Sequence, residues 1–193
     1  MTIEIAVSEV VDMFERTVRS AETPRYTIDG VLQPLLALHE NNIEQWKCED
    51  TARRDAGDDR AVAAAKRDID LLNTKRHELV EAIDAALAAG LDQAASAPPA
   101  TESPAMVFDR VSVLVIRIAF TEQVATSGSP DRDVCERRLP VLYEQLSLLR
   151  EALEALFDDV DAGRRRFVPY QSLKLYRAAP TRPSSHAGDI HPD

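Results

Sequence analysis

Imidazole and carboxylate side chains interrupt the apolar face of a helix that the sequence predicts from about residue 31 to residue 54. At about 100° per residue, His39 and Asp50 lie on the inward face of this helix and Glu49 lies at its edge. Such groups carry protons in general acid–base catalysis. His39, Glu49 and Asp50 are therefore the candidate catalytic residues. The same face also contains Leu32, Leu35, Leu36, Asn42, Ile43, Trp46 and Arg53.

Arginines recur among the apolar residues of two further predicted helices. The helix expected over residues 60–89 carries Asn73 and Arg76, and the stretch 106–120 carries Asp109, Arg110 and Arg117. A guanidinium group suits carboxylate and phosphate because it can donate two parallel hydrogen bonds. These residues therefore predict a site for an anionic small molecule. Its candidate ligand-binding residues are Asn42, Trp46, Arg53, Asn73, Arg76, Asp109, Arg110 and Arg117.

Polar groups on inward helix faces allow two interpretations, and the residues alone leave both open. They can form a structural network that fixes the register of the helices, because buried charges must be paired. They can equally line a pocket between helices, where bundles commonly bind ligands. The charge of Arg76 should be paired, by Asp50 or Asp109. An arginine without a carboxylate partner in a pocket would favour ligand binding, whereas a dry core of paired arginines would favour the network.

The elements that must position these residues are helices. The expected ranges are 3–20, 31–54, 60–89, 104–126 and 131–161, separated by breaks rich in Gly, Pro and Ser. The stretch 106–120 is apolar on most sides, which is typical of a helix that packs on several sides. We therefore predict an all-α bundle of five main helices around a buried central helix. Residues 1–177 form a single helical domain in this prediction, and residues 178–193 form a flexible C-terminal tail.

Composition limits the classes of function. The formal net charge is −10, with a sequence pI of about 4.9, so nucleic acid and an anionic membrane surface are disfavoured as partners. No basic signal sequence and no transmembrane run is present, and we expect a cytoplasmic protein. Glycine-rich phosphate loops and the Glu-x-x-His pairs of di-iron proteins are absent. Acidic residues at helical spacing could hold Mg²⁺, but such runs usually cover solvated faces, so no metal ligand or cofactor is assigned. That acidic set is Glu49, Asp50, Glu78, Glu81 and Asp84.

Four groups of residues together form a pattern that extends over nearly the whole chain. They are Asn42, Trp46, Glu49-Asp50 and Ala52-Arg53; then Ile69-Asp70, Leu72-Asn73, Arg76, Glu81 and Ile83-Asp84; then Glu102, Pro104, Asp109-Arg110, Ser112 and Leu114; and finally Lys174 and Tyr176. This pattern resembles an uncharacterised bacterial family known only as a domain of unknown function. The resemblance implies an all-helical protein, often encoded near glycosyltransferases or biosynthetic genes. It adds Lys174 and Tyr176 to the candidate ligand-binding residues.

The chain departs from the family pattern at three positions. Lys47 and Phe120 lie where relatives commonly have histidine, and His77 lies where they have asparagine. If those histidines carry chemistry in relatives, this chain has altered or lost it.

Two function hypotheses follow. The first is a small-molecule enzyme or binding protein for an anionic, phosphorylated or nucleotide-activated metabolite, in bacterial glycan or secondary-metabolite biosynthesis. The second is a noncatalytic helical interaction module that forms a homodimer through a C-terminal leucine seam. That seam comprises Leu142, Leu146, Leu149, Leu153 and Leu156.

Overall fold

The computed structural model describes residues 5–20, 30–54 and 57–173. These residues form five helices and, within those ranges, no β-strand. The helices are α1 Val7–Arg19, α2 Leu32–Arg54, α3 Asp59–Gly90, α4 Pro104–Ala125 and α5 Arg132–Asp161. The prediction of an all-α fold with five main helices is confirmed. The expected domain boundary at residue 177, the tail from residue 178, and Lys174 and Tyr176 all lie outside the described residues.

Side-chain caps define where two of the helices begin. The carboxylate of Asp58 accepts hydrogen bonds from the backbone N–H groups of Arg60 and Ala61 at 2.9 and 3.1 Å, so Asp58 caps α3. Ser103 caps α4, and Pro104 occupies its first turn, where the missing N–H has no helical partner to lose. The sequence therefore places the starts of both helices that carry the candidate arginines.

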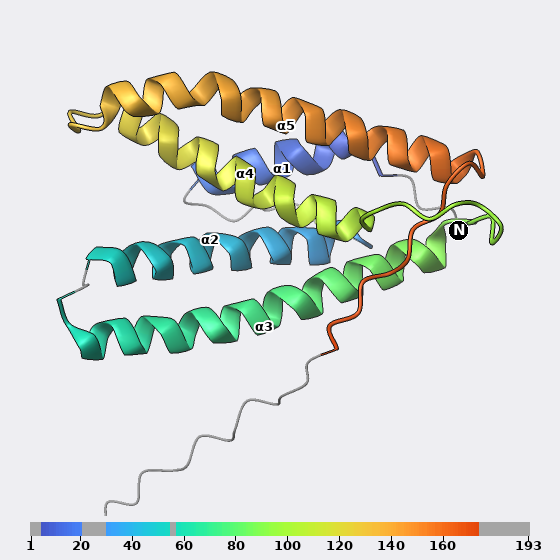
Figure 1. The fold of residues 1–193 in the computed structure, drawn as a ribbon, viewed down its shortest axis with the longest axis horizontal. Coiled ribbons are helices and arrows are strands. Elements are labelled where there is room, and N and C mark those ends of the chain that lie inside the picture. Colours follow the sequence, from blue (N-terminus) through green and yellow to red (C-terminus); the bar gives the residue numbers. More distant parts are fainter. Residues whose placement is uncertain (1–4, 21–29, 55–56, 174–193) are drawn as a thin grey trace, which may run out of the picture.

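The helices pair as two hairpins that are neighbours in sequence (Figure 1). Helix α2 packs along α3, and α4 packs along α5. Helix α4 also contacts α1, α2 and α3, and it has more buried residues than any other described helix. Its charged side chains are consequently held close to all four neighbouring helices. None of the helices in the described ranges combines the length and apolarity needed to cross a bilayer.

The leucine seam of α5 faces the core of its own chain. Leu146 and Leu153 are buried, and Leu142, Leu149 and Leu156 pack half-buried against the core. A dimer through this seam would therefore have to expose core leucines. Pro140 lies inside α5, which begins at Arg132, and so it does not mark the start of that helix.

The segment after α5 forms no helix and runs past the start of α4 to α3 (Figure 1). Arg166 donates its backbone N–H to the carbonyl of Pro98 at 3.1 Å, and Phe167 donates to the side chain of Gln93 at 2.7 Å. The backbone N–H of Tyr170 bonds the carboxylate of Asp84 at 2.9 Å. We call residues 164–173 the C-terminal strap, because they bind α5 to α3 and to the 91–103 loop.

Candidate functional site

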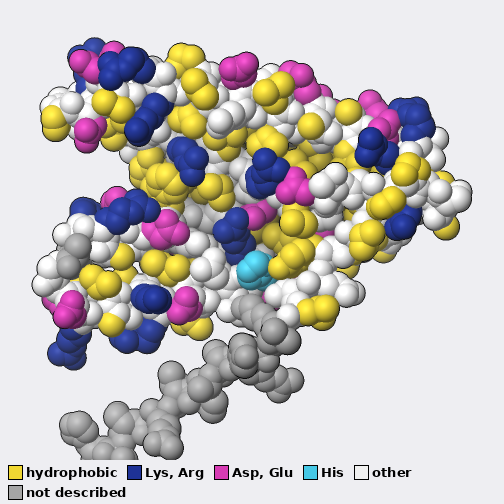
Figure 2. Space-filling view, viewed as in Figure 1, with side chains coloured by type: hydrophobic (Ala, Val, Ile, Leu, Met, Phe, Trp, Pro, Cys, Tyr) yellow, Lys and Arg dark blue, Asp and Glu magenta, His cyan; other side chains and the backbone are white. Residues whose placement is uncertain are grey.

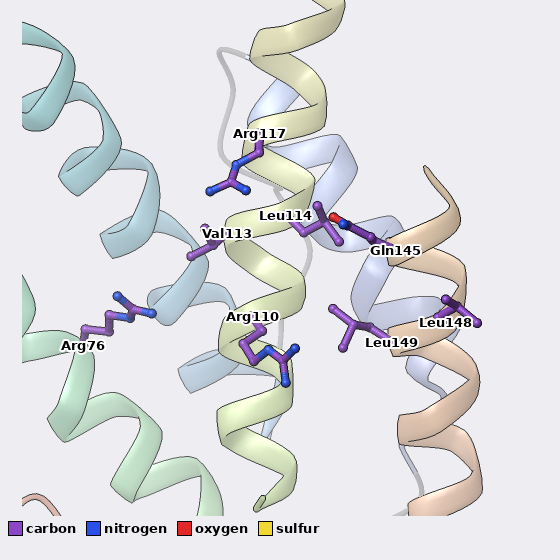
Figure 3. A pocket seen from close by; sticks show the side chains of 8 residues that line it. All are labelled: Arg76, Arg110, Val113, Leu114, Arg117, Gln145, Leu148 and Leu149. Atoms are coloured by element: carbon purple, nitrogen blue, oxygen red, sulfur yellow. The ribbon is translucent and has the colours of Figure 1, made fainter. Parts of the chain in front are cut away.

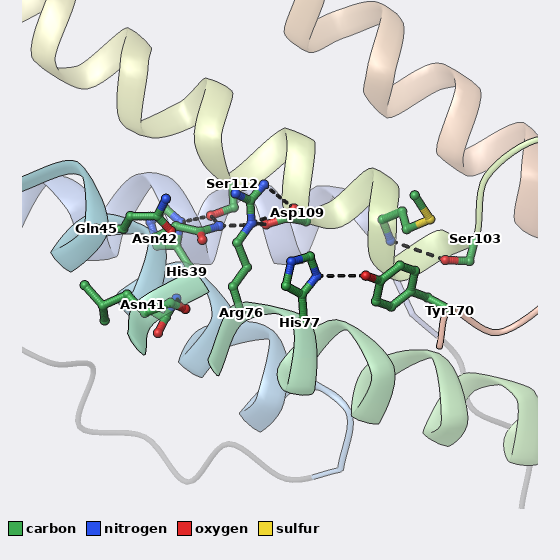
Figure 4. A network of polar contacts seen from close by, with 12 residues as sticks. His39, Asn41, Asn42, Gln45, Arg76, His77, Ser103, Asp109, Ser112 and Tyr170 are labelled. Carbon is green, nitrogen blue, oxygen red and sulfur yellow. Dashed lines mark hydrogen bonds and ion pairs between the residues drawn. The ribbon is translucent and has the colours of Figure 1, made fainter. Parts of the chain in front are cut away.

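A buried polar network joins α2, α3 and α4 (Figure 4). His39 Nδ1 lies 2.8 Å from Ser112 Oγ, and Asn42 donates to Ser112 Oγ at 3.0 Å and to Asp109 Oδ1 at 2.9 Å. Arg76 Nε donates to both Asp109 oxygens at 2.8 and 2.9 Å, and Nη2 donates to Oδ2. The predicted pairing of Arg76 is confirmed with Asp109; Asp50 takes no part in it.

His39 lies deep inside this network. Its side chain is fully buried and stacks on Phe14, with ring centroids 4.4 Å apart. Burial lowers the pKa of His39 to about 4, although the backbone of Phe14 acts in the opposite direction. The imidazole is therefore neutral at neutral pH, and it lines none of the cavities described next. Its predicted role in proton transfer stays a prediction.

A hollow opens beside the network, between the α2/α3 hairpin and the α4/α5 hairpin (Figure 2). Three adjoining cavities occupy it, of about 520, 210 and 550 Å³, and together they are called the cleft. The first, the leucine-walled cavity, is lined by Arg76, Arg110, Val113, Leu114, Arg117, Gln145, Leu148 and Leu149 (Figure 3). The second, the small cavity, is lined by Asn42, Gln45, Trp46, Glu49, Arg76, Val113, Ile116 and Arg117. The third, the tryptophan–arginine cavity, is lined by Trp46, Arg117, Thr121, Arg137, Arg138, Val141 and Leu142.

The arginines of the cleft differ in whether they have a carboxylate partner. Arg76 pairs with Asp109, and Arg110 Nη1 lies 2.6 Å from Glu102 Oε2. Within the described ranges, Arg117, Arg137 and Arg138 make no ion pair and no side-chain hydrogen bond. Arg117 lines all three cavities, and its guanidinium points away from α4 toward α2 (Figure 3). Unpaired positive charge is thus concentrated on one wall of the cleft.

An aromatic pair forms another part of the wall. The rings of Trp46 on α2 and Phe120 on α4 are stacked with centroids 5.6 Å apart and an angle of 13° between their planes. Trp46 is only partly buried and lines both the small and the tryptophan–arginine cavities. One of the positions at which the chain departs from the family pattern, Phe120, therefore supports a residue of the cleft.

The remaining predicted site residues lie at or beyond the edge of the cleft. Glu49 lines the small cavity and pairs with Arg53 at 3.0 Å. Asp50 and Arg53 are exposed, and Asp50 pairs with Arg54 at 3.5 Å. The expectation that Asp50 and Arg53 face inward is wrong, because the last turn of α2 lies where the two hairpins diverge, away from α4 (Figure 1).

Asn73 is half-buried on α3 and lines none of the three cavities. Nowhere in the described ranges do three or more His, Cys, Asp or Glu side chains gather closely enough to hold a metal ion. The acidic side chains considered as Mg²⁺ ligands, all within the described ranges, therefore do not come together at one site.

Sequence reasoning missed several cleft residues on α5. Arg137, Arg138, Val141, Gln145 and Leu148 recur at the three- and four-residue spacing of one helix face, and this spacing was a usable signal. The Leu142–Leu156 seam occupies the adjacent face and accounts for the apolar pattern without them. Ser112 was also missed as a site residue, although it lies one helical turn after Asp109 on α4 and accepts from Asn42.

Comparison with protein families identifies the relatives of this chain. A family model described as "Protein of unknown function (DUF4254)" matches residues 33–168, well over half of the sequence. The chain belongs to this family. Every described residue that lines the cleft lies within the DUF4254 match. Neither the comparison with curated proteins nor the comparison with solved structures found a match.

Proposed function

We propose that the protein binds an anionic small molecule in the cleft, with Arg117 as the central contact. The observation that carries this proposal is the absence of carboxylate partners for Arg117, Arg137 and Arg138, within the described residues, on one cavity wall. The whole sequence has 33 acidic and 23 basic residues, so acidic side chains outnumber basic ones. Three neighbouring cations left unpaired in such a chain indicate a ligand that supplies the negative charge.

The chemistry of arginine favours phosphate or carboxylate groups as that charge. Guanidinium groups form charge-assisted, bidentate hydrogen bonds with the oxygens of both groups. A concave surface also strengthens the field of its charges, which raises the local concentration of an oppositely charged ligand. Cavities of about 520 and 550 Å³ fall within the size range of small-molecule sites. The buried network behind the cleft joins α4 to α2 and α3, and so it holds in place the helix from which Arg117 extends.

Glu49 is the best candidate for chemistry on the bound molecule. Among the described residues that line the cleft it is the one carboxylate, and it lies in the small cavity together with Arg117. A carboxylate beside an arginine-held anion can accept or donate a proton during a reaction. His39 acts in this proposal by holding Ser112 and thereby the position of Asn42, which borders the same cavity.

The test uses pyrophosphate as the probe and isothermal titration calorimetry as the measurement. We expect wild-type protein to bind pyrophosphate, and Arg117→Gln to weaken binding by about tenfold or more, since a charge-assisted bond contributes about 1.5–3 kcal/mol. Arg132→Gln is the matched control, because Arg132 is exposed on α5, pairs with Glu136 and lines no part of the cleft. Equal affinities for wild type and Arg117→Gln would contradict the proposal.

A second candidate, a noncatalytic interaction module, is supported by a different observation. Val141 and Leu148 on α5 are 53% and 58% exposed, and both line the cleft. Because the leucine seam packs inward, a homodimer would use this exposed face instead. Light scattering distinguishes the two ideas: a dimer that Leu148→Glu dissociates, combined with no binding of pyrophosphate, would favour the interaction module.

A further inference from the structure

We infer that the ligand of the tryptophan–arginine cavity is a nucleotide with at least two phosphates. This inference rests on the proposed function and narrows its ligand class. It combines the unpaired arginines, which need a polyanion, with the aromatic pair Trp46–Phe120, which offers a surface for a flat ring.

The number and origin of the arginines indicate more than one negative group. Arg117 extends from α4, whereas Arg137 and Arg138 extend from the first turns of α5. A single carboxylate is satisfied by one guanidinium fork, so three forks on the wall of one cavity suit a ligand with several anionic oxygens. A diphosphate offers two phosphoryl groups in a row and can contact arginines from both helices at the same time.

The aromatic pair supplies the second half of the recognition. Trp46 is held by Phe120 at a centroid distance of 5.6 Å, so its ring is oriented before any ligand arrives. A core tryptophan would be enclosed, but Trp46 is partly exposed and lines two of the three cavities. Stacking of a base on an aromatic side chain contributes through the π-face that every nucleobase has. The pair therefore favours a nucleotide without selecting one base.

The cavity on the other side of Arg117 has space for a group attached to the terminal phosphate. This leucine-walled cavity measures about 520 Å³, and its walls include Leu114, Leu149 and the amide of Gln145. Its two other arginines, Arg76 and Arg110, already have carboxylate partners. A nucleotide that carries a less charged substituent would thus extend from the tryptophan–arginine cavity past Arg117 into the leucine-walled cavity.

The chain has one tryptophan, so its fluorescence reports directly on this site. The probes are ADP, UDP, pyrophosphate and adenosine, each titrated into the full chain with fluorescence and calorimetry. We expect ADP and UDP to change the Trp46 emission and to bind about fivefold or more tightly than pyrophosphate, which is the contribution expected from one stacked base. Pyrophosphate should bind without the base-dependent change in emission.

Two variants separate the halves of the site. Trp46→Leu should remove the advantage of ADP over pyrophosphate, so that the two probes bind with similar affinity. The double variant Arg137→Gln/Arg138→Gln should weaken ADP and pyrophosphate alike by about tenfold or more, and Arg132→Gln should weaken neither. Circular dichroism checks that the variants fold. If Trp46→Leu does not fold, two other results still test the nucleotide inference: the affinities of the wild type for ADP and pyrophosphate, and the effect of the arginine double variant on both.

The outcomes distinguish this inference from the proposed function. If pyrophosphate binds in an Arg117-dependent way but ADP and UDP bind no more tightly, the nucleotide inference is overturned and the anion site remains. If no probe binds, both are overturned. Adenosine binding as tightly as ADP, with no dependence on Arg137 and Arg138, would also overturn the inference, because the arginines would then have no role in it.

Discussion

Arg76 and Asp109 are the charged pair through which α3 holds α4. Arg76→Met would leave the carboxylate of Asp109, which is 8% exposed, with only the amide of Asn42 as a side-chain partner within the described residues. We expect the free energy of unfolding to fall by about 2 kcal/mol, less than for a fully buried pair because the Arg76 side chain is 29% exposed. Urea unfolding without ligand measures this.

Arg165→Met is the control for that experiment. Arg165 contacts Asp159 at 3.4 Å from a half-exposed position, and such pairs contribute about 1 kcal/mol or less. Equal losses of stability in the two variants would show that the Arg76–Asp109 pair does not hold α3 to α4.

His39 makes stability depend on pH. The pKa of His39 is about 4 in the folded state, below its ordinary value of 6.5. Between pH 4 and pH 6.5, the imidazole is therefore mostly protonated in the unfolded chain and mostly neutral in the folded chain. The free energy of unfolding should therefore fall as the pH decreases from about 6.5 toward 4. When the pH is lowered from about 7.5 to 5, we expect the free energy of unfolding of the wild type to fall by about 2 kcal/mol more than that of His39→Gln, as measured by urea unfolding.

The comparison of two proteins isolates this effect. Burial raises the pKa of Asp84, so Asp84 adds stability as the pH falls and acts against His39. Asp84 is present in both proteins, so its contribution cancels in the difference. Parallel pH profiles for wild type and His39→Gln would contradict the low pKa of His39.

At the level of single residues, the sequence predicted the types of side chain better than their surroundings. The inward positions of His39 and Asn42 followed from helical periodicity, as did the need of Arg76 for a partner. Asp50 and Arg53 have the same periodicity but are exposed, because burial also depends on which neighbouring helix reaches that turn. That information lies in the packing of α4 and not in the local sequence.

At the level of elements, Asp84 connects three parts of the chain. Its carboxylate accepts from the backbone N–H of Ala105 in the first turn of α4 and from Tyr170 in the C-terminal strap, both at 2.9 Å. Asp84→Ala would leave both donors unsatisfied at a fully buried position. We expect the free energy of unfolding of this variant to fall by about 2–3 kcal/mol, and hydrogen exchange in residues 164–173 to become faster.

The matched control on the same helix is Asp70→Ala. Asp70 is exposed on α3, and its side chain makes no ion pair within the described residues. Hydrogen exchange detected by mass spectrometry should show no change in the strap of this variant. Unchanged exchange in Asp84→Ala would mean that His77, whose ring bonds Tyr170 Oη at 2.8 Å, holds the strap without Asp84.

Helix α5 contains a proline, Pro140, that interrupts its backbone hydrogen bonding. Pro140 lies inside the helix on the exposed side and has no N–H to donate to the carbonyl of Glu136. Pro140→Ala should therefore raise the free energy of unfolding by about 1–2 kcal/mol, after allowance for the greater freedom that alanine gives the unfolded chain. A lower melting temperature would indicate that the neighbouring cleft residues need the proline.

The helices themselves were predictable because their apolar residues recur with helical periodicity, and because α3 and α4 also begin at side-chain caps. Asp58, Ser103 and Pro104 act locally, so the chain shows the starts of α3 and α4 before any packing is known. The cleft was not predictable in the same way. It requires Arg117 on α4 to lie near Arg137 and Arg138 on α5, and that proximity depends on how the α4/α5 hairpin closes.

For the whole molecule, net charge and cleft charge have opposite signs. A chain of net charge −10 repels itself, and salt screens this repulsion. When NaCl is raised from about 20 to 300 mM, we expect the free energy of unfolding to increase by about 1 kcal/mol, which corresponds to roughly 3 °C in melting temperature. Pyrophosphate affinity should fall over the same range, since salt also screens its attraction to the arginines. If affinity and melting temperature both rise with salt, the binding is not carried by the arginines of the cleft.

The pairing of helices that are neighbours in sequence has a consequence for the order in which the molecule forms. The contacts of α2 with α3 and of α4 with α5 close short loops, and proteins rich in such local contacts fold rapidly. Each hairpin can therefore collapse by itself, early after the chain is released from denaturant. The cleft has no counterpart in either hairpin alone, because its walls come from both. In a refolding experiment, ligand-binding capacity should consequently appear after helical signal, and the delay would measure the time the two hairpins take to dock.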